Sequence, residues 1–83
     1  MQITLKLYAT LGDFLPPQAR KQTILVDVPT DTTAAELIDR CKIPREKAHL
    51  VLLNGIYIAP AERQKKTLAN GDTLAVWPPI AGG

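Results

Sequence analysis

Two segments in the first third of the chain alternate apolar and polar residues with a period of two, which is the pattern of a strand with one buried face. Residues 2–8 and 23–28 both show it, and Pro29 ends the second because proline has no amide to donate to a sheet. The side chains expected to face inward are Ile3, Leu5, Leu7, Ile24, Val26 and Val28. The chain must therefore form two half-buried strands close together in sequence, and we predict a hairpin.

A helix is predicted next, starting at Thr33. Thr33 and Glu36 form a capping-box pattern, in which a threonine hydroxyl and a glutamate carboxylate satisfy free amides at a helix start. One apolar stripe follows at helical spacing, made of Ala34, Leu37, Ile38 and Cys41. We expect the stripe to cover the sheet, Lys42 to lie in the last turn, and the helix to end close to Ile43, because Pro44 follows.

The remaining strands come from the second half of the chain. Residues 50–53 are continuously apolar, which favours a strand buried on both faces near the middle of the sheet. Asn54-Gly55 is typical of a tight turn before a short return strand at 56–58. We expect 60–66 to be a loop or a short helical turn, and 73–77 to be the last strand.

The segments between strands are read in the same way. Residues 9–22 lose the alternation and include two adjacent prolines, so we expect an irregular surface connection with Phe14 and Leu15 packed on the core. Asn70-Gly71-Asp72 predicts a further turn.

The order strand, strand, helix, strand, short strand, strand indicates an α+β domain. We predict a β-grasp, ubiquitin-like layout: a mixed sheet of four to five strands with one main helix packed on one face. The predicted domain spans 1–77, and 78–83 form an extended tail.

Composition argues against several functions. Ten Lys plus Arg against eight Asp plus Glu give a net charge of +2, without a basic stripe, so we expect no nucleic-acid partner. No apolar run is long enough for a membrane span, which takes about 18 residues, and the N-terminus does not read as a signal peptide. Cys41 is the only cysteine, which suits a reducing compartment. We therefore expect a cytoplasmic protein with no membrane partner and no bound cofactor or metal.

The sequence ends Trp77-Pro78-Pro79-Ile80-Ala81-Gly82-Gly83, directly after the last predicted strand. The two prolines end the sheet and favour polyproline II, so the last five residues form an arm that reaches about 16 Å. The two glycines make its end thin enough for a narrow channel. Its reactive group is a carboxylate, which becomes a good electrophile only after activation such as adenylation by ATP. The plain alternative is a frayed end or an expression remnant.

Three motifs resemble the ubiquitin-like sulfur carriers, a family that includes the small subunit of molybdopterin synthase and the thiamine-pathway sulfur carrier. They are Leu53-Asn54-Gly55, the run from Leu68 to Leu74, and the run from Trp77 to Gly83. The Pro-Pro-hydrophobic-small-Gly-Gly ending looks more like that of the molybdopterin synthase small subunit than that of the thiamine-pathway carrier. Two positions depart from that branch, Gly12-Asp13 after the first strand and Asn70 before Gly71, and they leave the pathway open.

The resemblance implies a non-catalytic carrier that supplies a reagent to other enzymes. A ubiquitin-activating-type enzyme would use ATP to adenylate the carboxylate of Gly83, with Gly82 beside it, and a sulfur donor protein would convert it to a thiocarboxylate. A large synthase subunit would then use the sulfur to build the molybdopterin or tungsten-pterin dithiolene. The alternatives are a carrier for thiamine, cysteine or another metabolite, a ubiquitin-like protein modifier, and a passive interaction domain.

Several other residues have two interpretations each. Trp77, Tyr57 and Ile80, with Pro78, Pro79 and Ala81, are candidates for partner binding, against ordinary core packing for Trp77. We favour a buried, inert Cys41 over a sulfur-relay thiol, and a structural His49. Arg20, Lys21, Lys65 and Lys66 are interpreted as solvated charges, with docking to an acidic partner as the alternative. The sequence holds no nucleophile–base pair or phosphate-binding glycine loop that would indicate an autonomous enzyme.

Overall fold

The computed structural model describes residues 1–17 and 19–79. The strands are β1 (Gln2–Leu7), β2 (Thr23–Asp27), β3 (Leu50–Leu53), β4 (Ile56–Tyr57) and β5 (Thr73–Trp77). The helix α1 (Ala34–Arg40) is joined by the 3₁₀ helices η1 (Ala9–Phe14), η2 (Arg45–Lys47) and η3 (Pro60–Glu62).

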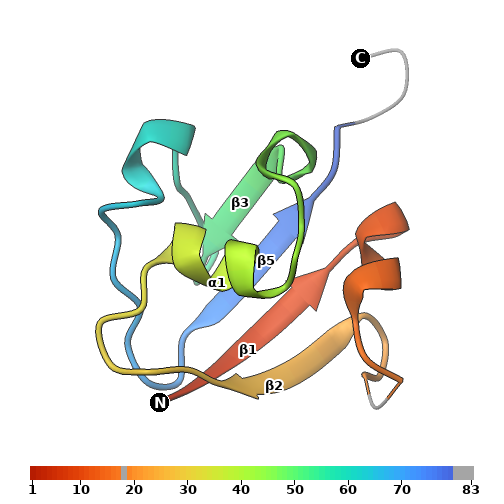
Figure 1. Cartoon of the computed structure of the whole chain (residues 1–83), viewed down its shortest axis with the longest axis horizontal. Helices are drawn as coiled ribbons and strands as arrows, with labels where there is room; N and C mark the ends of the chain where they lie inside the picture. Colours follow the sequence, from red (N-terminus) through yellow and green to blue (C-terminus); the bar gives the residue numbers. More distant parts are fainter. Residues whose placement is uncertain (18, 80–83) are drawn as a thin grey trace.

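The strands form one mixed sheet in the order β2-β1-β5-β3-β4, with α1 over one face (Figure 1). β1 and β5 run parallel, and the other neighbours are antiparallel. The predicted β-grasp, α+β arrangement is confirmed. No helix in the described part of the chain is both long and apolar enough to cross a membrane.

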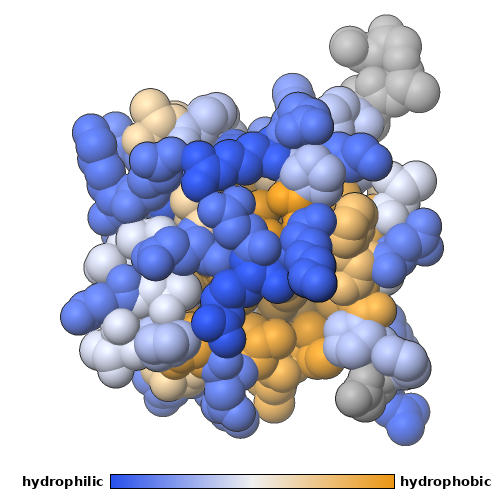
Figure 2. All heavy atoms as spheres, in the orientation of Figure 1, coloured by the Kyte–Doolittle hydropathy of each residue, from blue (hydrophilic) through white to orange (hydrophobic). Residues whose placement is uncertain are grey.

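The core lies between the sheet and α1. The alternation predicted for the first strand is confirmed, because Ile3, Leu5 and Leu7 are all buried against the helix side. Ala34, Leu37 and Ile38 are the buried residues of α1 that face them. α1 is short, so Ile24 and Val26 of β2 are only partly covered, and Figure 2 shows hydrophobic surface over β1 and β2 beside the helix.

The capping box at the start of α1 is confirmed. The amide of Glu36 donates to the Thr33 hydroxyl at 3.2 Å, and the Thr33 amide donates to the Glu36 carboxylate at 3.0 Å. The predicted end near Ile43 is wrong, since α1 ends at Arg40 and Cys41 is its C-cap. Lys42 lies beyond the helix with φ +62, which is not a helical conformation. The chain has therefore left the helix before Pro44 could end it.

Two further predictions are corrected. β3 is not buried on both faces, because only Val51 and Leu53 are buried and the central strand of the sheet is β5. A single helix covers one face of β3, and the other face has no second layer in the described structure. Residues 9–22 are also less irregular than expected, because η1 occupies Ala9–Phe14, although Phe14 and Leu15 do pack on the core.

The Asn54-Gly55 turn is confirmed, and a second tight turn went unnoticed in the sequence. Asn54 and Gly55 have φ +52 and +83, as a two-residue hairpin loop requires. Lys21 and Gln22 adopt the same left-handed region, with φ +51 and +64. Arg20 and Thr23 close this turn through two backbone hydrogen bonds of 3.0 and 2.9 Å. Long side chains at two such positions are strained.

Replacing Lys21-Gln22 by Asn-Gly is expected to stabilise the protein by about 1 kcal/mol, because these residues adopt positive φ at lower cost. The melting temperature should rise by about 4–8 °C, measured by circular dichroism. The reverse type of change, Gly55→Gln, should lower it, since Gly55 lies at φ +83. An unchanged or lower melting temperature in the Asn-Gly variant would show that this turn carries no strain.

A candidate docking face at the root of the tail

The predicted tail begins at the end of the central strand. Pro78 is half-buried and Pro79 is exposed, directly after β5. The predicted site residues Ile80, Ala81, Gly82 and Gly83 lie outside the described residues. The described structure therefore shows the surface around the start of the tail, at the end of β5.

An aromatic stack lies at that point. The rings of Tyr8 and Trp77 are parallel within 4°, with centroids 4.3 Å apart. Trp77 is held on both sides, because the Tyr8 amide donates to the Val76 carbonyl at 3.0 Å and the His49 amide donates to the Trp77 carbonyl at 2.9 Å. Both aromatic residues are half-buried, so Trp77 is not a core residue. Sequence reasoning did not single out Tyr8, although it ends the first alternating segment.

The stack belongs to a larger apolar area on the sheet face opposite α1. Strand register places Ala75 beside Leu52, Leu52 beside Tyr57, and Trp77 beside Leu50. Tyr57 is 53% exposed. We call this area the outer patch, and its residues are Tyr8, Leu50, Leu52, Tyr57 and Trp77, with Ala75 buried among them. The fold thus places two of the predicted partner-binding residues, Trp77 and Tyr57, on one surface at the root of the tail.

Arg63 links the segments around β3 and β4, and nothing in the sequence marked it. It is buried, and its guanidinium donates to three backbone carbonyls: Ile58 at 3.1 Å, Ala48 at 2.6 Å and His49 at 3.1 Å. These contacts join the segment before β3 to the segment after β4. Burial lowers the pKa of the Arg63 guanidinium from its usual value. The Arg63 guanidinium therefore links these two segments inside the fold through three charged hydrogen bonds.

Asp72 has the structural role that the sequence suggested. Its carboxylate accepts from the Ala69 amide at 2.8 Å and from the Asn54 side chain at 2.9 Å, while the Thr73 amide donates to Asn54 at 2.9 Å. The two turns that flank β3 and β5 are thus tied together, at the end of β5 opposite the tail.

Neither the Cys41 thiol nor the metal-ligating side chains of the described residues indicate a reactive site. Cys41 is half-buried, and burial raises the pKa of its thiol, while nearby Arg40 acts in the opposite direction. A thiol that stays protonated is a poor nucleophile, which favours the inert interpretation. Within residues 1–17 and 19–79, no three His, Cys, Asp or Glu side chains are grouped as a metal site would require.

Comparison with solved structures gives whole-chain similarities. SAMP1 from Haloferax volcanii is 27% identical, with all of both chains covered and a TM-score of 0.68. Urm1 from Trypanosoma brucei is 17% identical over 99% of this chain and 95% of its own, with a TM-score of 0.69. In the complex of subunits 1 and 2 of molybdopterin-converting factor from Helicobacter pylori 26695, one chain is 15% identical over all of both chains, with a TM-score of 0.62. The last two similarities concern the fold alone.

Comparison with curated protein sequences gives no match. The model of the ThiS family, in contrast, matches residues 9–83, which is almost the whole chain and includes the tail. The chain belongs to the ThiS family, and with it to the ubiquitin-like sulfur carriers.

Proposed function

We propose that this protein is a sulfur carrier for molybdopterin or tungsten-pterin cofactor synthesis. The carboxylate of Gly83 attacks ATP on a ubiquitin-activating-type enzyme, which gives an acyl adenylate and releases pyrophosphate. Sulfide supplied by a donor protein then attacks the carbonyl carbon and displaces AMP, which leaves a thiocarboxylate. A large synthase subunit takes up this sulfur, so the carrier acts as a reagent of a cytoplasmic pathway and not as an autonomous enzyme.

The observation that carries this proposal is the family match, which extends through Gly82 and Gly83. The choice of the pterin branch is supported by the Pro78-Pro79-Ile80-Ala81 sequence before the glycines and by the fold shared with one chain of the molybdopterin-converting factor complex. The four residues would form the arm that carries Gly83 into a partner's active site.

The outer patch is the proposed docking surface for these partners. It combines apolar area with two aromatic side chains, Tyr8 and Trp77, at the root of the tail. Aromatic residues of this kind supply much of the binding energy at protein interfaces. Docking through the outer patch would hold the tail pointed at the partner's active site, which converts a chance encounter into a fixed geometry.

Trp77→Ala is expected to raise the KM of the cognate activating enzyme for the carrier by about 10–100-fold while kcat changes little, because docking energy is lost and the reacting end is not touched. Carrier-dependent exchange of pyrophosphate with ATP measures both constants. Leu25→Ala is a suitable control, since Leu25 is 60% exposed on the same face of the sheet but lies on β2, two strands from β5 and outside the outer patch. A folded Trp77→Ala variant with an unchanged KM would remove the outer patch from the proposal.

A second candidate function is protein modification. It is favoured by the 26–27% identity to two solved structures from Haloferax volcanii, one of which is described as small archaeal modifier protein 1. The same adenylated Gly83 would then be passed to lysine amines. Conjugates that persist in boiling detergent with a thiol reductant, and that disappear when Gly83 is deleted, would establish this function.

A further inference from the structure

A second apolar surface lies at the β4 edge, on the face of the sheet that carries α1. One row of apolar side chains crosses all five strands in register: Ile24, Leu5, Leu74, Leu53 and Ile56. Its inner members are covered, and Leu53 is 6% exposed. The last member, Ile56, is 72% exposed, the highest value among the large hydrophobic residues of the described chain. The apolar face of the sheet therefore extends to β4, where its last side chain, Ile56, is exposed to solvent.

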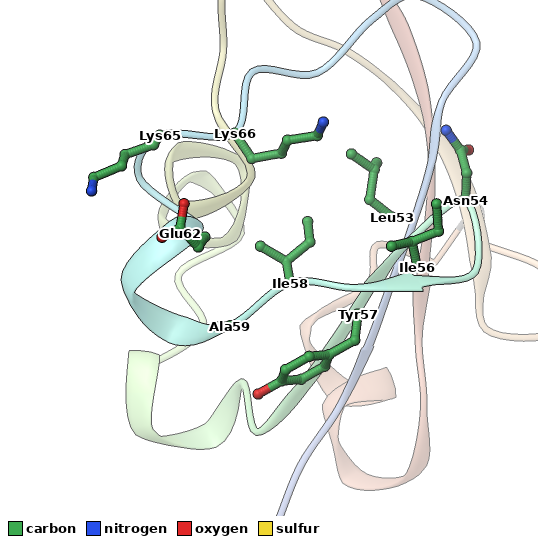
Figure 3. Close-up of a pocket in the computed structure, with 9 residues that line it drawn as sticks. All are labelled: Leu53, Asn54, Ile56, Tyr57, Ile58, Ala59, Glu62, Lys65 and Lys66. Atoms are coloured by element: carbon green, nitrogen blue, oxygen red, sulfur yellow. The ribbon is translucent and has the colours of Figure 1, made fainter.

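The uncovered end of this row opens into a groove of about 400 Å³, which we call the β4 groove. Figure 3 shows Leu53, Ile56 and Ile58 directed to the same side of β4, whereas Tyr57 points to the opposite side. The chain segment that leaves β4 through Ala59 forms the far wall. The β4 groove thus opens on the side of β4 opposite to the Tyr57 side chain, although Tyr57 is also among its lining residues, and three core-type side chains line it.

The rim of the β4 groove is cationic. Lys65 and Lys66 both line it, against one carboxylate, Glu62. In Figure 3 the Lys66 side chain extends across the mouth toward Asn54. The Lys66 backbone is fixed, because its carbonyl accepts from the Ala34 amide at 3.0 Å at the start of α1. An occupant with apolar side chains and negative charge would therefore complement the groove.

The edge of β4 also offers main-chain groups. The Ile58 amide donates to the Val51 carbonyl at 3.0 Å, which makes these two residues a hydrogen-bonded pair of the antiparallel ladder. Hydrogen-bonded and non-hydrogen-bonded pairs alternate in such a ladder, so the N–H and C=O of Tyr57 point away from β3. An extended segment can bond to them as an added strand.

We propose that the β4 groove binds an extended, acidic segment of a partner protein. The segment pairs with the main chain of Tyr57, places an aliphatic side chain on Leu53, Ile56 and Ile58, and sets its carboxylates against Lys65 and Lys66. This binding uses neither the tail nor a side chain of the outer patch, because Tyr57 contributes only its main chain, so one carrier domain can hold such a segment while its tail is engaged elsewhere.

The test is a methyl and amide NMR titration of the full chain with two synthetic peptides. They are acetyl-Asp-Asp-Val-Ile-Val-Asp-Asp-amide and the same peptide with lysine in place of each aspartate. The acidic peptide should shift the Ile56 and Ile58 methyls and the Tyr57 amide in a saturable way, with a Kd below about 1 mM. It should bind at least about tenfold more tightly than the lysine peptide.

Variants at the β4 groove give the matched comparison. Ile56→Ser and Lys66→Glu should each weaken the acidic peptide by about tenfold, and Leu25→Ser, at the other exposed edge, should leave it unchanged. All three positions are exposed, so the variants should keep the fold. Equal binding of the two peptides, shifts confined to Tyr8 and Trp77, or no shifts at about 1 mM peptide would each overturn the proposal.

Discussion

Deletion of Gly83 is expected to lower sulfur transfer by at least about 100-fold while leaving the melting temperature unchanged. The truncated chain still ends in a glycine carboxylate, but that carboxylate stands about 3.3 Å short of its place in the activating enzyme. A displacement of about 1 Å from the reacting geometry already costs on the order of 100-fold in rate. The described hydrophobic core runs from Ile3 to Val76, so the deletion removes none of it.

The truncated carrier also supplies its own control. Because it keeps Tyr8, Trp77 and the rest of the outer patch, it should compete with the intact carrier for the activating enzyme. Inhibition of pyrophosphate exchange by the truncated chain measures this competition. Sulfur transfer near the level of the intact carrier would contradict the role assigned to Gly83, whereas a fall in melting temperature would mean that the tail supports the fold.

Arg63→Met is expected to lower the free energy of unfolding by about 3 kcal/mol, the largest stability effect that we foresee for a single side chain. Methionine replaces the aliphatic stem but leaves the carbonyls of Ala48, His49 and Ile58 without their charged donor. Domains of this size are stable by about 4–12 kcal/mol, so this loss is a large share of the total. Each kcal/mol lost lowers the melting temperature of such a domain by about 4–8 °C, and the expected fall is therefore about 12–24 °C. Circular dichroism and chemical denaturation measure the two quantities.

The matched control is Arg45→Met. Arg45 forms an ion pair with Asp39 at 2.8 Å, but both side chains are largely exposed. Exposed pairs of this kind contribute little to stability, and the melting temperature should stay close to that of the parent chain. Arg63→Lys should fall between the two, since one ammonium cannot reach three carbonyls in the guanidinium geometry. Equal effects at Arg63 and Arg45 would show that the three carbonyl contacts do not brace the fold.

The sequence predicted the features that depend on local patterns. The alternation of the first strand, the Thr33–Glu36 capping box and the Asn54-Gly55 turn involve residues within one element, and all are confirmed. The helix end was misplaced because Pro44 marks only the latest point at which a helix must stop. Lys42 turns the chain off earlier, and a lysine at positive φ has no signature in the sequence.

The features that the sequence did not predict depend on distant contacts. Tyr8 meets Trp77 only because β1 and β5 lie side by side in parallel, a pairing between opposite ends of the chain. Arg63 stands in a polar, charged segment where an arginine is usually solvated, and its burial follows from carbonyls that β3 and β4 bring to it. The burial of β3 was overestimated because an apolar run does not tell whether a second layer is present.

The most direct test of the sulfur-carrier account is the intact mass of the protein after incubation with its cognate activating enzyme, ATP and a sulfide source. The account predicts the mass gain of one oxygen replaced by sulfur, located on the C-terminal peptide that ends at Gly83 and absent when ATP is omitted. A mass that stays unchanged in the complete reaction, with an activating enzyme shown to load another carrier, would contradict it.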